Sequence, residues 1–349
     1  MKLATVLAQL FLIGFHKGTA FVPIYYRAQW HVQNQQGLAF AAVQGMAQAD
    51  NNLDATMEQA TVHEIPGPFP GTKVTLIGTA HLSKQSNEQV DRIIEKVRPD
   101  VVAVELDENR LQRIGFSSFA DIGIETVVTA SDIEVPSNNN SNKPNEPWWK
   151  LPQVVGRDLA LNLIAQTARK MLTGMYDGAS QTLGNKAGGE FLAAIEACKK
   201  YNVQKLVLAD QDSTETIKRT AALALDSGDF FGFLSRLEQV NEEELSVLKA
   251  RVMNDILDED QKNDEAAFTM AMMEELKADT SFRTRLFDRL EKEVPEFTTT
   301  FVKERDYIMS EAIRREVVDN GAKHVVGVVG LAHVDGMKNN LQEIFSSTN

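Results

Sequence analysis

Two short apolar runs that end in the same Gly-x-x-His pattern constrain the fold more than any other feature of this sequence. The first is Lys73–His81, KVTLIGTAH, and the second is Val325–His333, VVGVVGLAH. An apolar, β-branched run bounded by glycine predicts a buried strand, and glycine lets the backbone turn sharply where the strand ends. We therefore predict that two strands bring His81 and His333 to the floor of one active site.

A further buried strand is predicted at Val101–Val104, after a helix over residues 83–97, and it is followed by Glu105 and Arg110. Strand, helix and strand in succession form a βαβ unit, so this strand is predicted to be the parallel neighbour of the strand that ends at His81. Open α/β sheets bind ligands at the carboxyl ends of their strands. His81 and Glu105 are therefore expected side by side. The alternative is that the acidic residues after the strand form only a solvated loop.

More ionisable residues follow a third predicted strand and lie on a late helix. Asp210 follows the strand at 206–209, and Arg219 lies on the helix after it. Glu304 and Arg305 lie between the apolar positions of another helix, so some of this charge is expected to face inward, where it needs a partner. A salt-bridge cluster on the surface is the alternative for this second pair.

Composition excludes several classes of protein. The formal net charge of −13 argues against a binder of nucleic acid or of anionic membranes. The single cysteine, Cys198, permits neither an internal disulfide nor a cysteine-based zinc site. No apolar run reaches the roughly 18 residues that a membrane span needs, so no stable transmembrane anchor is expected. With 349 residues, 43% of them hydrophobic, the chain can bury a sizeable core.

The first 65 residues are predicted to be addressing segments rather than part of the fold. Residues 1–20 have the basic start, apolar core and small residues of a secretory signal peptide. Residues 21–65 begin with an acid-poor stretch, as transit peptides do. The junction Thr19–Pro23 resembles that of the bipartite presequences that address proteins to complex algal plastids. We expect a plastid location; secretion, or an endomembrane location, with a disordered pro-segment is the alternative.

The folded domain is predicted over residues 66–349. It contains a polar low-complexity loop at 131–147 and a helical insertion at 230–293, which is expected to cap the edge of the sheet. The fold class is α/β, with a central, mostly parallel sheet flanked by helices.

Six motifs, in this order, resemble the TraB family, which is related to PrgY-type pheromone-shutdown proteins and more distantly to the GumN and TIKI proteins. They are GTAHLS at 78–83, VAVELDENR at 102–110, GGEFLAAIEA at 188–197, VLADQDSTETIKR at 207–219, KERDYIM at 303–309 and VVGVVGLAHVDGM at 325–337. The resemblance implies a sheet flanked by helices, as in TIKI and erythromycin-esterase-like proteins. Some relatives carry C-terminal membrane helices; this chain stops soon after the last motif, which implies a soluble form.

The resemblance also implies a chemistry. In TIKI relatives, two Gly-x-x-His histidines and a glutamate are associated with a divalent metal and peptide hydrolysis, and the matching positions here are His81, His333 and Glu105. Two imidazoles and a carboxylate suit Zn, Mn or Co, and a metal lowers the pKa of its bound water towards neutrality. Glu105 would be the third ligand or the general base. We therefore expect a metal-dependent hydrolase of peptides or of other amides and esters.

Two other functions stay open. One is metal-free hydrolysis, with His81 or His333 as general base beside Glu105. The other is a soluble regulator without enzymatic activity, which binds or sequesters a peptide or a protein partner in the same cleft. In a hydrolase, Arg110, Arg219 and Arg305 would stabilise an oxyanion or bind a substrate carboxylate. The candidate catalytic residues are Glu105, Arg110, Asp210, Arg219, Glu304 and Arg305.

Overall fold

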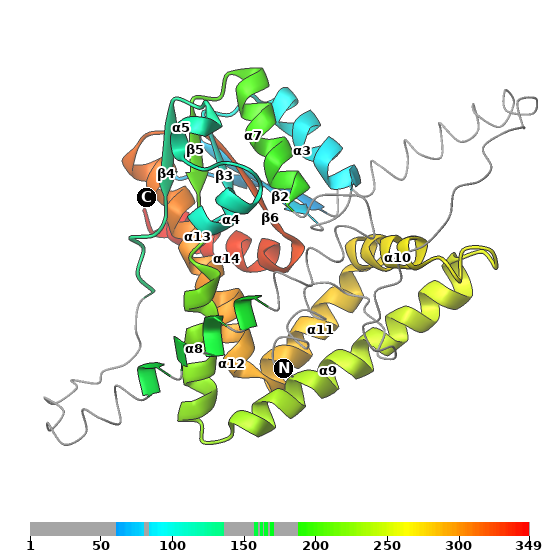
Figure 1. Ribbon diagram of the computed structural model, residues 1–349. Coiled ribbons are helices and arrows are strands. Elements are labelled where there is room, and N and C mark those ends of the chain that lie inside the picture. The colour runs from blue at the N-terminus through cyan, green and yellow to red at the C-terminus, as the bar shows by residue number, and fades with distance from the viewer. Residues whose placement is uncertain are drawn as a thin grey trace, which may run out of the picture.

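The computed structural model describes residues 61–79, 84–135 and 188–348, together with helical positions 157–159, 161–162, 164–166 and 168–170. His81, the predicted addressing segments up to residue 60 and most of the low-complexity loop lie outside the described residues. The described part contains a six-stranded sheet, helices on both faces of this sheet, and a layer of helices at one end of it (Figure 1).

The strands are β1 (Val62–Pro66), β2 (Lys73–Thr79), β3 (Val101–Val104), β4 (Thr126–Thr129), β5 (Lys205–Leu208) and β6 (His324–Gly330). The α-helices are α3 (Lys84–Val97), α4 (Glu108–Arg113), α5 (Phe119–Ile122), α7 (Gly189–Tyr201), α8 (Ser213–Asp226), α9 (Phe230–Arg251), α10 (Glu265–Ala278), α11 (Thr280–Glu293), α12 (Pro295–Thr298), α13 (Glu304–Arg314) and α14 (Leu331–Ser347). Three π-helical turns continue α9, α12 and α13, namely η2 (Val252–Ile256), η3 (Thr299–Lys303) and η4 (Arg315–Asp319).

The sheet has the strand order β1-β2-β6-β3-β5-β4, and all pairs are parallel except β1 with β2. The α/β class with a mostly parallel sheet is thereby confirmed. In the register of β2 with β6, Gly78 lies opposite Val329 and Thr79 lies opposite Gly330. The two Gly-x-x-His motifs, which begin at Gly78 and Gly330, therefore start one residue apart on two neighbouring strands, although they come from opposite ends of the folded domain.

The predicted pairing of the strand at Lys73–Thr79 with that at Val101–Val104 is half right. The two strands are parallel, but β6 lies between them and pairs with both. A βαβ unit fixes the direction of its strands and not their adjacency, because the connecting helix can cross over one further strand. The uninterrupted apolar run of β6 can be buried on both faces only inside a sheet, and it takes this interior position.

The sheet also begins earlier than predicted. β1 starts at Val62, so the last residues of the segment assigned to a transit peptide, 62–65, belong to the fold. The sequence has prolines at positions 66, 68 and 70, and proline favours turns over the interior of a strand. Proline is nevertheless acceptable at the end of an edge strand, where its missing N–H removes no bond of the sheet interior.

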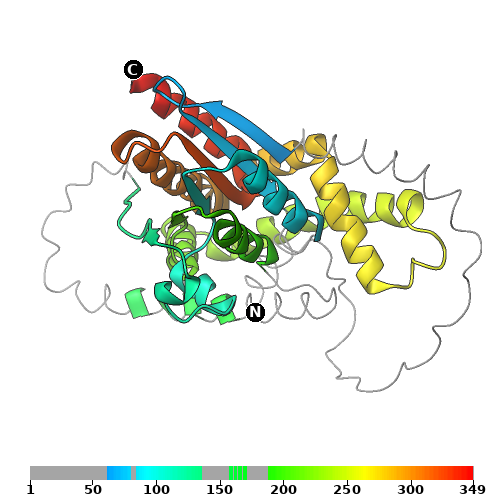
Figure 2. The ribbon, with the colours of Figure 1, turned by 90° about the horizontal axis from the view of Figure 1, so that it is seen from above.

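Two hydrophobic cores cover the two faces of the sheet. Successive residues of a strand point to opposite faces. Accordingly Val102 and Val104 of β3 pack in one core with side chains of α3 and α7, whereas Val101 and Ala103 pack in another with α13 and α14. Figure 2 shows the resulting layers, with α14 and α13 on one side of the sheet and α3 and α7 on the other.

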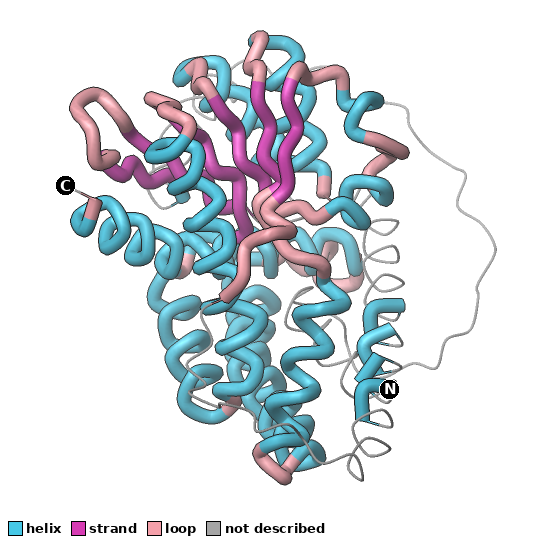
Figure 3. The backbone as a smooth tube through the Cα atoms, turned by 90° about the vertical axis from the view of Figure 1, so that its left-hand side faces the viewer, coloured by secondary structure: helices cyan, strands magenta, loops and turns pink. Residues whose placement is uncertain are grey.

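A third core lies in the helical layer, at the end of the sheet where the parallel strands finish (Figure 3). Phe233 of α9, Phe282 of α11 and Phe297 of α12 are among its buried side chains. Residues 230–293 carry only helices and turns, as predicted for the insertion, and α8 and α12 complete the layer. Within the described part of the chain, no helix has both the length and the apolar character to cross a membrane.

Candidate active site

The ends of neighbouring strands gather charged side chains at one place. Glu105 follows β3, Asp210 follows β5, and His333 lies in the first turn of α14, directly after β6. These side chains are buried: Glu105 is 2% exposed, Asp210 is 4% exposed and His333 is 3% exposed. The three side chains meet because β6 pairs with β3 and β3 pairs with β5, which brings the ends of these parallel strands side by side. The structure therefore brings these three predicted site residues together, whereas His81 lies outside the described residues.

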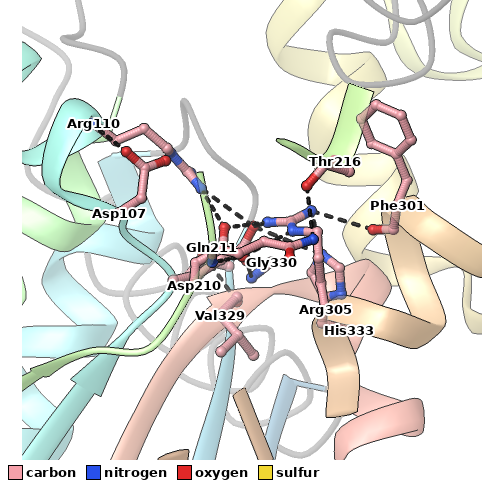
Figure 4. Close-up of polar contacts among 12 residues, drawn as sticks. Asp107, Arg110, Asp210, Gln211, Thr216, Phe301, Arg305, Val329, Gly330 and His333 are labelled. Atoms are coloured by element: carbon pink, nitrogen blue, oxygen red, sulfur yellow. Dashed lines mark hydrogen bonds and ion pairs between the residues drawn. The ribbon is translucent and has the colours of Figure 1, made fainter. Parts of the chain in front are cut away.

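Arg305 of α13 is the centre of this cluster (Figure 4). Its Nε donates to Oδ1 of Asp210 at 3.0 Å, and its Nη2 donates to Oδ2 of the same carboxylate at 2.7 Å. Nη2 also donates to Oε1 of Glu105. Nη1 donates to Nε2 of His333 at 3.0 Å and to the carbonyl oxygen of Phe301 at 3.3 Å. All five N–H groups of the guanidinium thus have acceptors inside the protein.

This saturation decides what Arg305 can do. Burial alone would lower the pKa of Arg305, but Asp210 and Glu105 more than offset this effect, so its pKa is raised and the group stays charged. With every N–H in use, Arg305 has none to offer to an oxyanion or a substrate carboxylate in this arrangement. Its contacts instead hold two carboxylates and one imidazole in fixed positions.

Arg110 of α4 lies at the rim of the cluster. Its Nη1 donates to Oδ2 of Asp210 at 3.0 Å and lies 3.7 Å from Oε1 of Glu105. Its side chain is 20% exposed, against 7% for Arg305. Burial opposes the charge of Arg110, but Glu105 and Asp210 raise its pKa overall. Among the described residues, only Asp210 accepts a hydrogen bond from this side chain, so Arg110 is the cluster arginine with N–H groups to spare.

His333 is held at both ring nitrogens. A guanidinium can only donate, so the Nε2 atom that faces Arg305 is an acceptor without a proton. The neutral ring then carries its proton on Nδ1, which donates to Oδ1 of Asp306 at 2.6 Å. Burial raises the pKa of Asp306, although His333 and Arg305 act in the opposite direction. Asp306 was not among the predicted site residues; the charged triplet within the apolar stripe of this helix is the signal that pointed to it.

The charged triplet of α13 is buried, so the surface salt-bridge alternative for Glu304 and Arg305 is wrong. Glu304, Arg305 and Asp306 are 7%, 6% and 3% exposed. Helical geometry sends successive side chains about 100° apart. Three consecutive residues can therefore all be buried only because this helix has neighbours on several sides. The π-turn η3 immediately precedes the triplet, and π-turns are frequent at functional sites.

Arg219 and Glu304 form a pair of their own. Arg219 Nε and Nη2 donate to the two carboxylate oxygens of Glu304 at 2.7 and 2.5 Å, and these bonds raise the pKa of Arg219. The side chain of Arg219 is 45% exposed. Among the described residues, this pair makes no hydrogen bond with the cluster around Arg305, so both residues link α8 to α13 beside the site rather than within it.

The TraB/PrgY/gumN family model matches residues 153–344, which is more than half of the chain. The chain belongs to the TraB/PrgY/gumN family. The resemblance seen in the sequence motifs is thereby confirmed, and the match includes Asp210, Arg305 and His333.

Curated relatives align over a longer part of the chain. The TraB domain-containing proteins of mouse and human are each 25% identical to it and cover 83% of it. An uncharacterized protein of Methanocaldococcus jannaschii is 24% identical over 78% of the chain. The chain spans 66% of the length of the mouse and human TraB proteins and 54% of the archaeal one.

The cluster of this TraB protein supplies some, but not all, of the features of a metal site. Nε2 of His333 and Oε1 of Glu105 are 3.6 Å apart. Two donors that each bind an ion at about 2.0–2.2 Å can lie that far apart. A carboxylate on the other ring nitrogen, here Asp306, is typical of ligating histidines. In the described ranges, however, no three His, Cys, Asp or Glu side chains are grouped so that they could hold an ion.

Two conditions follow for a metal in this TraB site. The third ligand must come from residues such as His81, which lie outside the described part. Arg305 must also release Nε2 of His333, because its Nη1 donates to the single lone pair of this atom. The thiol of Cys198 contributes neither a ligand nor a nucleophile, since it is fully buried in the sheet core and burial raises its pKa to about 12.

Asp107 is a further carboxylate beside the TraB cluster that the sequence analysis did not single out. Its Oδ1 caps α4 by accepting from the backbone N–H of Arg110, whereas Oδ2 is buried and has no hydrogen-bond partner among the described residues. Burial raises the pKa of Asp107 even though Arg110 opposes this. The folded state therefore binds a proton at Asp107 more tightly than the unfolded state, in which the pKa is near 3.8.

Replacing Asp107 with asparagine should therefore stabilise the protein at pH 7. Between a pH near 3.8 and the raised pKa, the folded wild type binds more protons than the unfolded chain, so its stability falls as the pH rises through this window. Asparagine keeps the capping oxygen and carries no charge. Thermal unfolding at pH 7 and at pH 3.5 should show an advantage of the variant at pH 7 that shrinks at the lower pH. The control is Asp229→Asn, an exposed cap paired with Arg236, which should gain nothing.

Proposed function

We propose that this chain is a hydrolase of peptides or of other amides or esters, with its reaction centre at the carboxyl edge of β6 and β3. One observation carries the proposal: Nε2 of His333, without its proton, and Oε1 of Glu105 converge to 3.6 Å in a buried site. The motif that contains His81 begins at Gly78 on the neighbouring strand, one residue from the level of Gly330. Oriented imidazoles and a carboxylate are the groups that water activation needs.

The proposal includes a divalent metal, Zn, Mn or Co, held by His81, His333 and Glu105. When bound, such an ion lowers the pKa of a coordinated water. The charges of the cluster support a cation there. Among the described residues, the cluster contains four buried carboxyl groups and two guanidinium groups. The carboxyl groups belong to Glu105, Asp107, Asp210 and Asp306, and the guanidinium groups to Arg110 and Arg305. Buried charge of one sign is costly unless it is balanced.

The chain's own residues have defined tasks in this hydrolysis. A water oxygen bonds to the carbonyl carbon, the C–N or C–O bond breaks, and the leaving atom receives a proton. Glu105 would take the proton of the water. Arg305 donates to its Oε1 and the backbone N–H of Gly330 donates to its Oε2 at 2.6 Å, and a carboxylate oxygen that accepts one hydrogen bond keeps a second lone pair. Two further hydrogen bonds to Asp210 keep Arg305 in place beside Glu105. Within the described part of the cluster, Arg110 is the arginine with N–H groups left for the developing oxyanion.

Metal analysis of the purified protein tests this proposal. We expect about one equivalent of metal in the wild type and less than about a tenth of that after His81→Ala with His333→Ala, because both substitutions remove ligands. The matched control is His324→Gln, a histidine at the opposite end of β6 that contacts Oγ1 of Thr75 at 2.8 Å. It should keep the metal. Equal and negligible metal in all three proteins would reject the metal.

Hydrolysis is assayed separately, with a library of peptides and of simple esters. Glu105→Gln should abolish turnover while the protein stays folded, since glutamine keeps the shape and loses the charge. Turnover that survives chelation of metals would favour the metal-free variant, in which a histidine acts as the base.

A second function has one observation in its favour. Arg305 and both oxygens of Glu105 are satisfied by groups of the protein itself, as expected of a structural network that only shapes a cleft. In that case the chain is a regulator that binds a peptide or protein partner. It would capture the partner without turnover, and Glu105→Gln would leave the capture unchanged.

A further inference from the structure

Asp306 and His333 come from two helices that pack against each other, α13 and α14. Nδ1 of His333 donates to Oδ1 of Asp306 at 2.6 Å, and both side chains are at least 96% buried. The same ring offers Nε2 towards Glu105 and Arg305. Without the hydrogen bond at Nδ1, the imidazole could turn about its bond to the backbone. The contact with Asp306 prevents this rotation and therefore fixes the direction in which Nε2 points.

Gly336 provides the space for this contact. It lies on α14 three residues after His333, which places it on the same side of the helix. A Cβ atom at Gly336 would lie 1.9 Å from Oδ2 of Asp306 and 2.7 Å from its Cγ, far closer than two unbonded atoms can approach. Any other residue at this position would push the carboxylate of Asp306 away. The close approach of α13 to α14 at this point therefore depends on a missing side chain.

We propose that Asp306 is the positioning residue of His333 and that Gly336 exists at its position to admit the Asp306 carboxylate. Asp306 holds the proton on Nδ1 and so directs the lone pair of Nε2, which accepts from Arg305, towards the reaction centre. It touches neither substrate nor metal itself. The claim about the ring stands on geometry alone; its consequence for metal binding rests on the proposed function.

The first test observes the hydrogen bond directly. In histidine-15N-labelled full-length protein, the Nδ1 proton of His333 should give a far-downfield, 15N-coupled resonance that is absent from His333→Gln. We expect Asp306→Ala to abolish this resonance, Asp306→Asn to shift it upfield, and Gly336→Ala to abolish or shift it. Asp335→Asn is the matched control, since Asp335 is an exposed carboxylate on α14 next to Gly336, and it should leave the resonance in place. An unchanged resonance in Asp306→Asn and Gly336→Ala would overturn the proposal.

The second test measures affinity for Zn²⁺ and Mn²⁺ by titration calorimetry on the same proteins. Loss of a carboxylate behind a ligating histidine typically weakens metal binding by about 10–100-fold. We expect a loss of that size for Asp306→Ala and Gly336→Ala, a smaller one for Asp306→Asn, and none for Asp335→Asn. Circular dichroism identifies a variant that fails to fold, and Asp306→Asn, which keeps the shape of the side chain, then decides the question.

The two tests separate the two proposals. If the wild type binds no metal but its His333 resonance depends on Asp306 and Gly336, the positioning role stands and the metal is rejected. If the wild type binds metal, and every variant keeps both the affinity and the His333 resonance, the metal stands and the positioning role is overturned.

Discussion

Replacing Arg305 with methionine should destabilise the protein by about 3–5 kcal/mol, the usual cost of removing one partner from a buried ion pair. Methionine fills a similar volume but supplies no donor. The substitution leaves the carboxylates of Glu105 and Asp210 buried without their main counter-ion, and it removes the hydrogen bonds that Arg305 donates to Nε2 of His333 and to the carbonyl oxygen of Phe301. Urea unfolding followed by circular dichroism measures the loss.

The control for this prediction is Arg110→Met. Arg110 makes one hydrogen bond to the cluster and is 20% exposed, so water can solvate what it leaves behind, and the loss should be well below that of Arg305→Met. Adding Asp210→Asn to Arg305→Met removes one stranded charge and should restore part of the stability, which a double-mutant cycle quantifies. A loss under about 1 kcal/mol for Arg305→Met, as for a surface ion pair, would contradict the central position given to this residue.

Phe233→Ala should cost about 3–5 kcal/mol, the range for deleting a buried phenylalanine side chain. Phe233 is 0% exposed and belongs to the core of the helical layer, together with Phe301. Phe301 in turn accepts a hydrogen bond from Arg305, so the helical layer and the charged cluster share a residue. We therefore expect the variant to unfold in one transition, at a lower urea concentration, with the layer and the sheet unfolding together.

The matched control lies two residues away on the same helix. Phe231 is 83% exposed, and Phe231→Ala should change stability by less than about 0.5 kcal/mol. Two separate transitions in Phe233→Ala, with the sheet unfolding at the wild-type midpoint, would show that the helical layer is an independent unit.

Much of the candidate site was predictable because its signals are local. Apolar runs followed by charged residues identified the strands that precede Glu105, Asp210 and His333, and the parallel direction of these strands places their ends at one edge. Likewise, the apolar stripe of the helix that carries Glu304 and Arg305 predicted that charge would face inward. Residues of the same strand or helix reveal their common face through a period of 2 or 3.6.

The sequence by itself determined the strands that precede the site residues, their parallel direction and the family, because these depend on local periodicity and on motifs. Only the tertiary structure decided which elements are neighbours. It placed β6 between β2 and β3, it made Arg305 the saturated centre of the cluster rather than a free donor, and it paired Asp306 with His333 over Gly336. The physical reason is that such contacts join residues far apart in the chain, whose partners are chosen by packing and by the need to balance buried charge.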